Sequence, residues 1–197
     1  TRAEILAATG SVLGAAGANL VVNEGEISVL MGLSGSGKST LLRAVNGLNK
    51  VTRGKVIVHG AHGDTDVVSC SEDELRKVRR GAVAMVFQQF ALFPHMTVGE
   101  NLSFPLEVRG MGKSDREAKV KRALDMVQMG AFINRRPAQL SGGQQQRIAL
   151  SRALVFEPEL VLMDEPLGAL DKQLREHMQF EIKHLHDRLG ITVVYVT

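Results

Sequence analysis

The stretch GLSGSGKST, residues 32–40, decides the fold of this 197-residue chain. It follows the apolar stretch EISVLM, residues 26–31, which we expect to form a strand, and it opens a helical pattern that runs to about Val45. A turn between a strand and a helix is the context that the phosphate-loop pattern G-x-x-x-x-G-K-[ST] requires. The stretch therefore predicts an α/β domain that binds a nucleoside phosphate.

The residue types of this loop suit an anion. Its glycines permit backbone angles at which successive N–H groups point inward, and the following helix adds the positive end of its dipole. Lys38 is expected to supply a charge for the β and γ phosphates, and the Ser39 hydroxyl is expected to ligate Mg²⁺. The predicted nucleotide contacts in this loop are Gly32, Ser34, Gly35, Ser36, Gly37, Lys38, Ser39 and Thr40.

Two adjacent acids end another apolar stretch, VLMDEP at residues 161–166. Ligands of open α/β sheets bind beyond the carboxyl ends of the strands, so both acids are expected at the nucleotide site. Asp164 is predicted to hold the Mg²⁺ shell, and Glu165 is predicted to take a proton from an attacking water. A general base of this kind contributes about 10² to 10⁴ in rate.

A third stretch, LSGGQQQR at residues 140–147, has the composition of another anion site. Ser141 offers a hydroxyl, Gly142 and Gly143 expose backbone N–H groups, and the helix that follows points its N-terminus at the bound group. The chain therefore encodes a second phosphate-binding element, for which many phosphate-loop proteins have no use.

Together, LSGGQ, GLSGSGKST, VLMDEP and GALD (168–171) resemble the ATP-binding cassette proteins, the nucleotide-hydrolysing subunits of ABC transporters. The resemblance covers nearly all of the chain. It implies an α/β fold of the P-loop NTPase class, an ABC-type cassette with a RecA-like α/β core, a β-subdomain and an inserted α-helical subdomain. It also implies ATP and Mg²⁺ as cofactors, and a head-to-tail dimer in which each LSGGQ signature contacts the γ phosphate held by the partner's phosphate loop.

The resemblance assigns further residues one by one. Gln88, which follows a predicted strand, is expected to contact the metal and the attacking water, with Gln89 as the alternative. Asp171 is expected to reach across the dimer. The implied catalytic residues are Glu165, Gln88 and Lys38; the implied metal ligands are Ser39, Gln88 and Asp164; the implied contacts to the partner's nucleotide are Ser141, Gly142, Gly143, Gln144 and Asp171.

Two departures from the family pattern lie at the ends of the chain. Residues 1–31 hold no Phe, Tyr or Trp, so the ring that often stacks on adenine is expected either before Thr1 or replaced by an aliphatic side chain. The closing stretch ITVVYVT, residues 191–197, reads as a buried strand, and the family places a histidine directly after it. We therefore expect a single nucleotide-binding domain, residues 1–197, that is truncated at its C-terminus.

The remaining stretches alternate between strand and helix patterns. The further expected strands are 55–60, 82–87 and 159–164. An amphipathic helix at 172–189 is expected to lead into the last strand as a parallel crossover. Helical spacing dominates residues 97–156, and the helical subdomain is assigned to about 90–156. The stretch HGAHGDTD, residues 59–66, holds metal-binding residue types but is better explained as a surface hairpin connection.

The resemblance implies an ATPase that drives transport across a membrane. The first half looks like importers of glycine betaine, choline and related osmoprotectants, and the second half looks like spermidine and putrescine importers. We expect uptake of a small organic cation, with osmoprotectants ranked before polyamines. The expected partners are a second cassette, transmembrane permease subunits that dock on Phe90 to Asn101 and, indirectly, an extracytoplasmic solute-binding protein.

The composition indicates where the protein acts in the cell and which other classes of protein are disfavoured. The sequence has a single cysteine, Cys70, and no apolar run of the roughly 18 residues that a membrane span needs, so we expect a peripheral protein on the cytoplasmic face of the inner membrane. A formal charge of +3 does not indicate nucleic acid by itself, and none is expected as a partner. A soluble cassette protein acting on DNA or ribosomes is disfavoured, because the short spacing between Lys38 and Ser141 leaves no room for an inserted coiled coil.

Overall fold

The strands of the structure form two sheets. The structure, a computed structural model, describes residues 2–61, 63–87, 90–168 and 172–197. The larger sheet is parallel, with four strands in the order β1-β6-β5-β4. Its strands are β1 (Ile27–Leu30), β4 (Val83–Val86), β5 (Leu160–Asp164) and β6 (Thr192–Val196). The predicted α/β fold is therefore confirmed.

Both faces of this sheet are buried, because alternate residues supply two different cores. Val161 of β5 is in register with Val193 of β6, and Leu162 is in register with Val194. The first pair belongs to one apolar cluster and the second pair belongs to the other. All four side chains are at most 3% exposed, so the near-continuous apolar runs of the sequence reflect a sheet that is covered on both sides.

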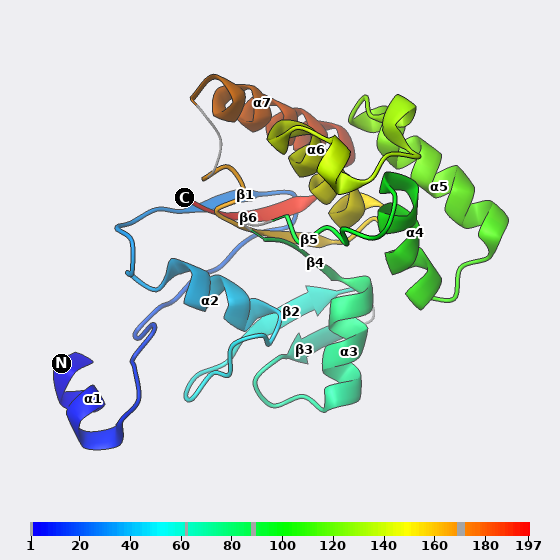
Figure 1. The fold of residues 1–197 in the computed structure, drawn as a ribbon. Coiled ribbons are helices and arrows are strands. Elements are labelled where there is room, and N and C mark those ends of the chain that lie inside the picture. Colours follow the sequence, from blue (N-terminus) through cyan, green and yellow to red (C-terminus); the bar gives the residue numbers. More distant parts are fainter. Residues whose placement is uncertain (1, 62, 88–89, 169–171) are drawn as a thin grey trace.

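Helices cover the two faces, as Figure 1 shows. On one side lie α2 (Lys38–Val45) and α3 (Glu72–Gly81), and on the other side lie α6 (Gly142–Leu154) and α7 (Lys172–Leu189). Leu42 is fully buried and anchors α2 in the cluster of Leu162 and Val194. The position of α2, which carries the end of the phosphate loop, is therefore fixed by the core.

A group of helices packs beside the sheet. In this group α4 (Val98–Val108), α5 (Lys113–Met126) and α6 contact one another. Their side chains in the shared core, each 0% exposed, are Val98, Leu102, Leu106, Leu124 and Ile148. The group falls within the segment 90–156 that the sequence assigned to a helical subdomain.

The short elements differ most from expectation. In the stretch 59–66, expected as a hairpin connection after the strand 55–60, residues 59–60 end β2 (Ile57–Gly60) and residues 63–66 form a further strand, β3 (Gly63–Asp66), which pairs with β2 in an antiparallel manner. Its sequence GDTD has no apolar alternation by which a strand could be recognised. Three short helices were also not predicted: α1 (Arg2–Thr9), which stands apart from the body in Figure 1, and the 3-10 helices η1 (Gly130–Phe132) and η2 (Pro137–Gln139).

Candidate functional site

The carboxyl ends of three strands meet at one edge of the large sheet. Leu30 at the end of β1 is in register with Val196 of β6, and Val196 is in register with Asp164 at the end of β5. The phosphate loop begins shortly after Leu30, and Glu165 follows Asp164 directly. The register therefore brings the predicted phosphate loop and the predicted carboxylate pair to the same edge, with β6 between them.

The phosphate loop depends on its glycines. Gly35 (φ 76°) and Gly37 (φ 98°) adopt the left-handed conformation, and Gly37 is the N-cap of α2. Lys38 Nζ donates hydrogen bonds to the carbonyl oxygens of Gly32 at 2.7 Å and Leu33 at 3.1 Å. The lysine thus folds back onto the start of its own loop, and phosphate oxygens would have to replace these two acceptors.

A cavity of about 280 Å³ opens over this loop. The N-terminal segment forms another wall, where a β-carbon at Gly37 would overlap the carbonyl oxygen of Gly14. The lining residues are Val12, Leu13, Gly14, Gly35, Ser36, Gly37, Lys38, Ser39, Thr40 and Glu165. Most of the predicted phosphate-loop contacts therefore face one cavity together with Glu165, whereas Gly32 and Ser34 do not line it.

Asp164 is paired with an arginine that the sequence did not single out. Arg43 donates from Nε at 2.9 Å and from Nη2 at 2.7 Å to the same oxygen, Oδ2 of Asp164. The side chain of Asp164 is 3% exposed and that of Arg43 is 44% exposed. A hydroxyl and a carboxylate are oxygen donors of the kind that Mg²⁺ prefers, so the donor set of Ser39 and Asp164 fits a magnesium site.

Glu165 has a backbone conformation that is uncommon for its residue type. Its φ of 45° lies in the left-handed region, where residues other than glycine are rare and gather at functional sites. The chain turns here, directly after β5, and Glu165 lines the cavity over the phosphate loop. This position suits a base that takes a proton from a water beside a phosphate.

The signature residues form the N-terminus of α6. Ser141 is the N-cap: its Oγ accepts from the Gln144 N–H at 3.4 Å, while Gln144 Oε1 accepts from the Ser141 N–H at 2.9 Å. A β-carbon at Gly142 would meet no atom within 4 Å, whereas Gly143 is buried. These four residues do not line the phosphate-loop cavity of their own chain. The structure of one chain therefore keeps the two predicted phosphate-binding elements apart.

A buried hydrogen bond links α6 to the turn after Glu165. Gln146 is 2% exposed, and its Nε2 donates to the carbonyl oxygen of Pro166 at 2.9 Å. Its Oε1 is buried without a hydrogen-bond partner among the described residues. The signature helix is thus in direct contact with the segment that carries the predicted base.

The same helix holds the loop at residues 90–91. Arg152 donates from Nη1 to the Ala91 carbonyl oxygen at 2.8 Å and from Nη2 to the Phe90 carbonyl oxygen at 3.1 Å. Phe90 and Ala91 are both left-handed, with φ of 46° and 49°. Burial lowers the pKa of the Arg152 guanidinium, which nevertheless stays cationic. A cation from α6 therefore stabilises an unusual loop conformation.

Three predicted site residues lie outside the described residues: Gln88, its alternative Gln89, and Asp171. Their roles stay predictions. The end of β4 is described, and Val86 there is in register with Met163 of β5. The chain that leads to Gln88 therefore leaves the sheet at the edge where Asp164 lies.

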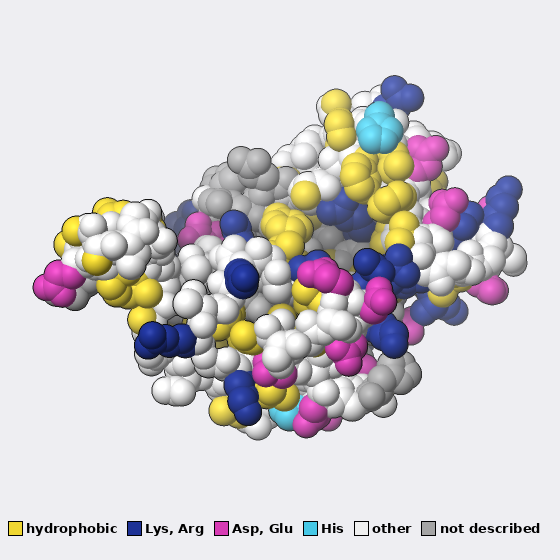
Figure 2. All heavy atoms as spheres, turned by 90° about the horizontal axis from the view of Figure 1, so that it is seen from below, with side chains coloured by type: hydrophobic (Ala, Val, Ile, Leu, Met, Phe, Trp, Pro, Cys, Tyr) yellow, Lys and Arg dark blue, Asp and Glu magenta, His cyan; other side chains and the backbone are white. Residues whose placement is uncertain are grey.

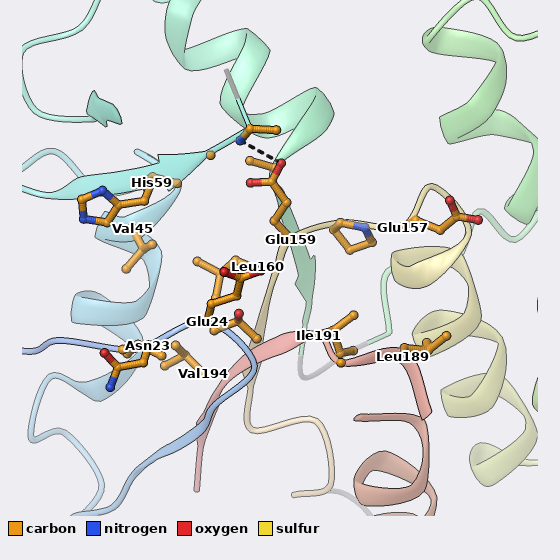
Figure 3. Close-up of a pocket in the computed structure, with 18 of the residues that line it drawn as sticks. Asn23, Glu24, Val45, His59, Glu157, Glu159, Leu160, Leu189, Ile191 and Val194 are labelled. Atoms are coloured by element: carbon orange, nitrogen blue, oxygen red, sulfur yellow. Dashed lines mark hydrogen bonds between the residues drawn. The ribbon is translucent and has the colours of Figure 1, made fainter. Parts of the chain in front are cut away.

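A larger hollow lies at the opposite end of the sheet (Figure 3). Its volume is about 1130 Å³, and the starts of β5 and β6 border it through Leu160 and Thr192. In Figure 3 Glu159 accepts a hydrogen bond from the Ala61 N–H, at 3.2 Å. The predicted site residues that the structure describes do not line this hollow. We therefore do not assign the nucleotide to it, although it is larger than the phosphate-loop cavity.

Comparison with known proteins gives the family. A family profile described as "ABC transporter" matches residues 15–168. The chain belongs to the ABC transporter family. This ABC cassette is 47% identical, over its whole length, to the glycine betaine transport ATP-binding protein OpuAA of Bacillus subtilis strain 168, of which it covers 46%. The resemblance that the sequence motifs indicated is therefore confirmed.

Other relatives of the ABC cassette are named for other solutes. The cassette is 47% identical to the sn-glycerol-3-phosphate import ATP-binding protein UgpC of Jannaschia sp., over 91% of the cassette and 48% of that protein. It is 46% identical to the spermidine/putrescine import ATP-binding protein PotA of Roseobacter denitrificans, over 91% of the cassette and 47% of that protein. The chain thus spans about half the length of these relatives.

A solved structure matches the fold of the ABC cassette. It is the dimeric post-hydrolysis state of the ATP-binding cassette MJ0796 bound to ADP and Pi, with a TM-score of 0.78 and 41% identity. The match covers 91% of this chain and 77% of that chain. The chain accordingly has the fold of an ABC-type ATP-binding cassette.

Sequence reasoning missed several residues of the site. Arg43 stands four positions after Ser39 on α2, a spacing that puts both on one helix face and that the sequence already displayed. Nothing in the sequence of residues 12–14 indicates that they would cover the phosphate loop. The bond from Gln146 to Pro166 likewise has no local signature.

Proposed function

We propose that this ABC cassette binds ATP with Mg²⁺, pairs with a second copy of itself and hydrolyses the nucleotide to drive uptake of a small organic cation. The observation that carries the proposal is the common cavity of Lys38, Ser39 and Glu165, beside the strand that ends at Asp164. Membership of the ABC transporter family and the likeness to a cassette bound to ADP and Pi support it.

Each residue of this cavity has a chemical task in the proposal. Lys38 leaves the carbonyl oxygens of Gly32 and Leu33 and bonds the β and γ phosphates, while the loop N–H groups bind the remaining phosphate oxygens. Ser39 and Asp164, with Gln88, would hold Mg²⁺, which would supply positive charge to neutralise the phosphates. Glu165 accepts the proton of the attacking water.

The signature acts on a second copy in this proposal. Ser141 and Gly142 lie away from the phosphate-loop cavity of their own chain, with open space in front of Gly142. Head-to-tail pairing would bring them, with the positive end of α6, to the γ phosphate of the partner. The dimeric state of the similar cassette MJ0796 supports pairing of two cassettes.

The test of this pairing is ATP-dependent dimerisation. In protein that carries Glu165→Gln, MgATP is expected to convert monomers into dimers, measured by light scattering after size-exclusion chromatography. Adding Gly142→Asp should abolish the dimer, because a carboxylate would face the partner's γ phosphate. A β-carbon at Gly142 meets no atom within 4 Å, so this change should not disturb the monomer.

Gly81→Asp is the matched control for this test. A β-carbon at Gly81, at the end of α3, also meets no atom within 4 Å. It adds the same charge away from the signature and should leave the dimer intact. Dimers that form equally well with Gly142→Asp would contradict the proposed pairing.

Membrane subunits are the proposed docking partners. The proposed docking segment, Phe90 to Asn101, lies beside exposed apolar side chains of α4. The ring of Phe93 lies 5.1 Å from that of Phe104 and 6.0 Å from that of His95, and Phe104 and Val108 of α4 are 39% and 46% exposed. Figure 2 shows hydrophobic side chains gathered beside a histidine on one face. Among the described residues, no helix has the length and apolar content to cross a bilayer.

We propose a peripheral place on the cytoplasmic face of the inner membrane, attached through permease subunits, with a solute-binding protein as an indirect partner. The names of the relatives, which are transport ATP-binding proteins, support this place. Nucleic acid has no part in the proposal. The contact between the cassette and the permease subunits would transmit closure of the cassette dimer to the permease.

Glycine betaine or a related osmoprotectant is the first candidate solute, because OpuAA is similar over the whole chain; a polyamine is the alternative. Deletion of the gene is expected to reduce uptake of labelled glycine betaine at high salt to background, with spermidine uptake unchanged. Restoring the intact gene should restore uptake, whereas Glu165→Gln should not. Loss of spermidine uptake alone would select the polyamine alternative.

A further inference from the structure

The ion pair of Arg43 with Asp164 has no part in the proposed function. Asp164 is only 2% exposed, and a carboxylate so deeply buried is stable as an anion only with a partner. Arg43 supplies that partner through two hydrogen bonds, which both end on Oδ2. Arg43 itself therefore does not occupy Oδ1 of Asp164.

Arg43 approaches Asp164 from the helix that also carries Ser39. The two residues are one helical turn apart on α2, so the guanidinium and the predicted metal-binding hydroxyl lie on the same helix face. The neighbouring Leu42 is fully buried, which fixes α2 against β5 and β6. The position of Arg43 beside the predicted metal site is thus set by the core.

The two partners differ in their access to water. The Arg43 side chain is 44% exposed and can withdraw into solvent, whereas the Asp164 side chain is 3% exposed and cannot. A metal ion that binds Asp164 can therefore take over the role of the guanidinium without leaving a buried charge unpaired.

We propose that Arg43 is a built-in counter-cation of the metal site: it keeps Asp164 oriented in the metal-free protein and competes with Mg²⁺ for this carboxylate. The inference rests on the proposed function, because it takes Asp164 as a metal ligand. Arg43 is a positioning residue, which acts through Asp164. Its presence lowers the affinity for metal and raises the stability of the metal-free state.

The test measures Mn²⁺ binding to the complete protein with ADP, by electron paramagnetic resonance, so that hydrolysis plays no part. Arg43→Met is expected to bind Mn²⁺ about tenfold more tightly, because a positive charge beside the site is removed. Without metal, its melting temperature should fall below that of the wild type, and Mn²⁺ should raise it by more than in the wild type. Arg43→Lys keeps the charge and should stay near the wild-type affinity.

Arg79→Met is the matched control. Arg79 also makes a forked contact, from Nε to the Asn46 carbonyl oxygen at 2.8 Å and from Nη2 to the Gly47 carbonyl oxygen at 2.9 Å. Its loss should lower the melting temperature without altering the affinity for Mn²⁺. A purely structural role of Arg43 would give the same pattern as this control.

Unchanged or weaker Mn²⁺ binding by Arg43→Met would overturn the inference. If this variant unfolds in chelator, recovery of the fold by Mn²⁺ with ADP supports it, and failure to fold in both conditions overturns it. ADP binding by the wild type in the presence of Mg²⁺ tests the proposed function separately. No ADP binding would reject that function, whereas ADP binding with an unaltered metal affinity in Arg43→Met rejects only the role of Arg43.

Discussion

Glu165→Gln is expected to remove most ATP hydrolysis and to leave ATP binding intact. Glutamine has nearly the size of glutamate but cannot accept the proton of the attacking water, and a lost general base lowers the rate by about 10² to 10⁴. The left-handed backbone at this position costs glutamate and glutamine about the same conformational free energy, so backbone strain does not account for the expected loss of hydrolysis. Phosphate release at saturating MgATP measures the rate, and calorimetric titration measures binding.

Glu159→Gln makes the same chemical change at the opposite end of the sheet. Glu159 borders the larger hollow and accepts from the Ala61 N–H, at the end of β5 opposite to Glu165. Hydrolysis by this variant should stay at the wild-type rate. Undiminished turnover in Glu165→Gln would show that Glu165 is not the base. The left-handed turn after β5 would then have no role in catalysis.

Lys38→Met is expected to weaken ATP binding by about 10² to 10⁴. Hydrogen bonds to charged groups contribute about 1.5–3 kcal/mol each, and the lysine is expected to bond two phosphates. In the structure its acceptors are carbonyl oxygens in an exposed part of the loop, which water can solvate in the variant. The melting temperature without nucleotide should therefore change little, while the titration with ATP shows the loss.

Lys50→Met removes the same charge from an exposed position just beyond α2. This control separates the general effect of lowering the positive charge from the specific contact at the phosphate loop. ATP affinity should stay near the wild-type value in Lys50→Met. Equal ATP affinities of Lys38→Met and the wild type would show that Lys38 of this loop does not bind the phosphates.

The parts of the site that could be predicted from the sequence are those in which neighbouring residues build one backbone shape. The phosphate loop needs left-handed glycines directly before a helix, and the stretch 32–40 supplies both. The pair Asp164 and Glu165 ends an apolar strand, and parallel strands end at one sheet edge. Ser141 and Gln144 also have the spacing of a capping box, which the structure forms.

The contacts that could not be predicted join distant parts of the chain. Arg43 and Asp164 are 121 positions apart, and their pairing depends on how α2 packs against the sheet. The approach of Gly14 to Gly37 is a contact between backbones and leaves no trace in residue type beyond the glycines. The strand β3 is polar and is specified by its partner β2 rather than by its own pattern.

The bond from Gln146 to Pro166 has a consequence for the proposed dimer. The N-terminus of α6 would touch the partner's nucleotide, while Gln146, little more than one turn along, holds the segment beside its own Glu165. Occupancy of one site would thereby bias the base of the other, which is a coupling free energy between two sites. ATP turnover by the dimer should then rise sigmoidally with ATP concentration. Removing the side-chain amide of Gln146 should make this dependence hyperbolic, as it is for independent sites.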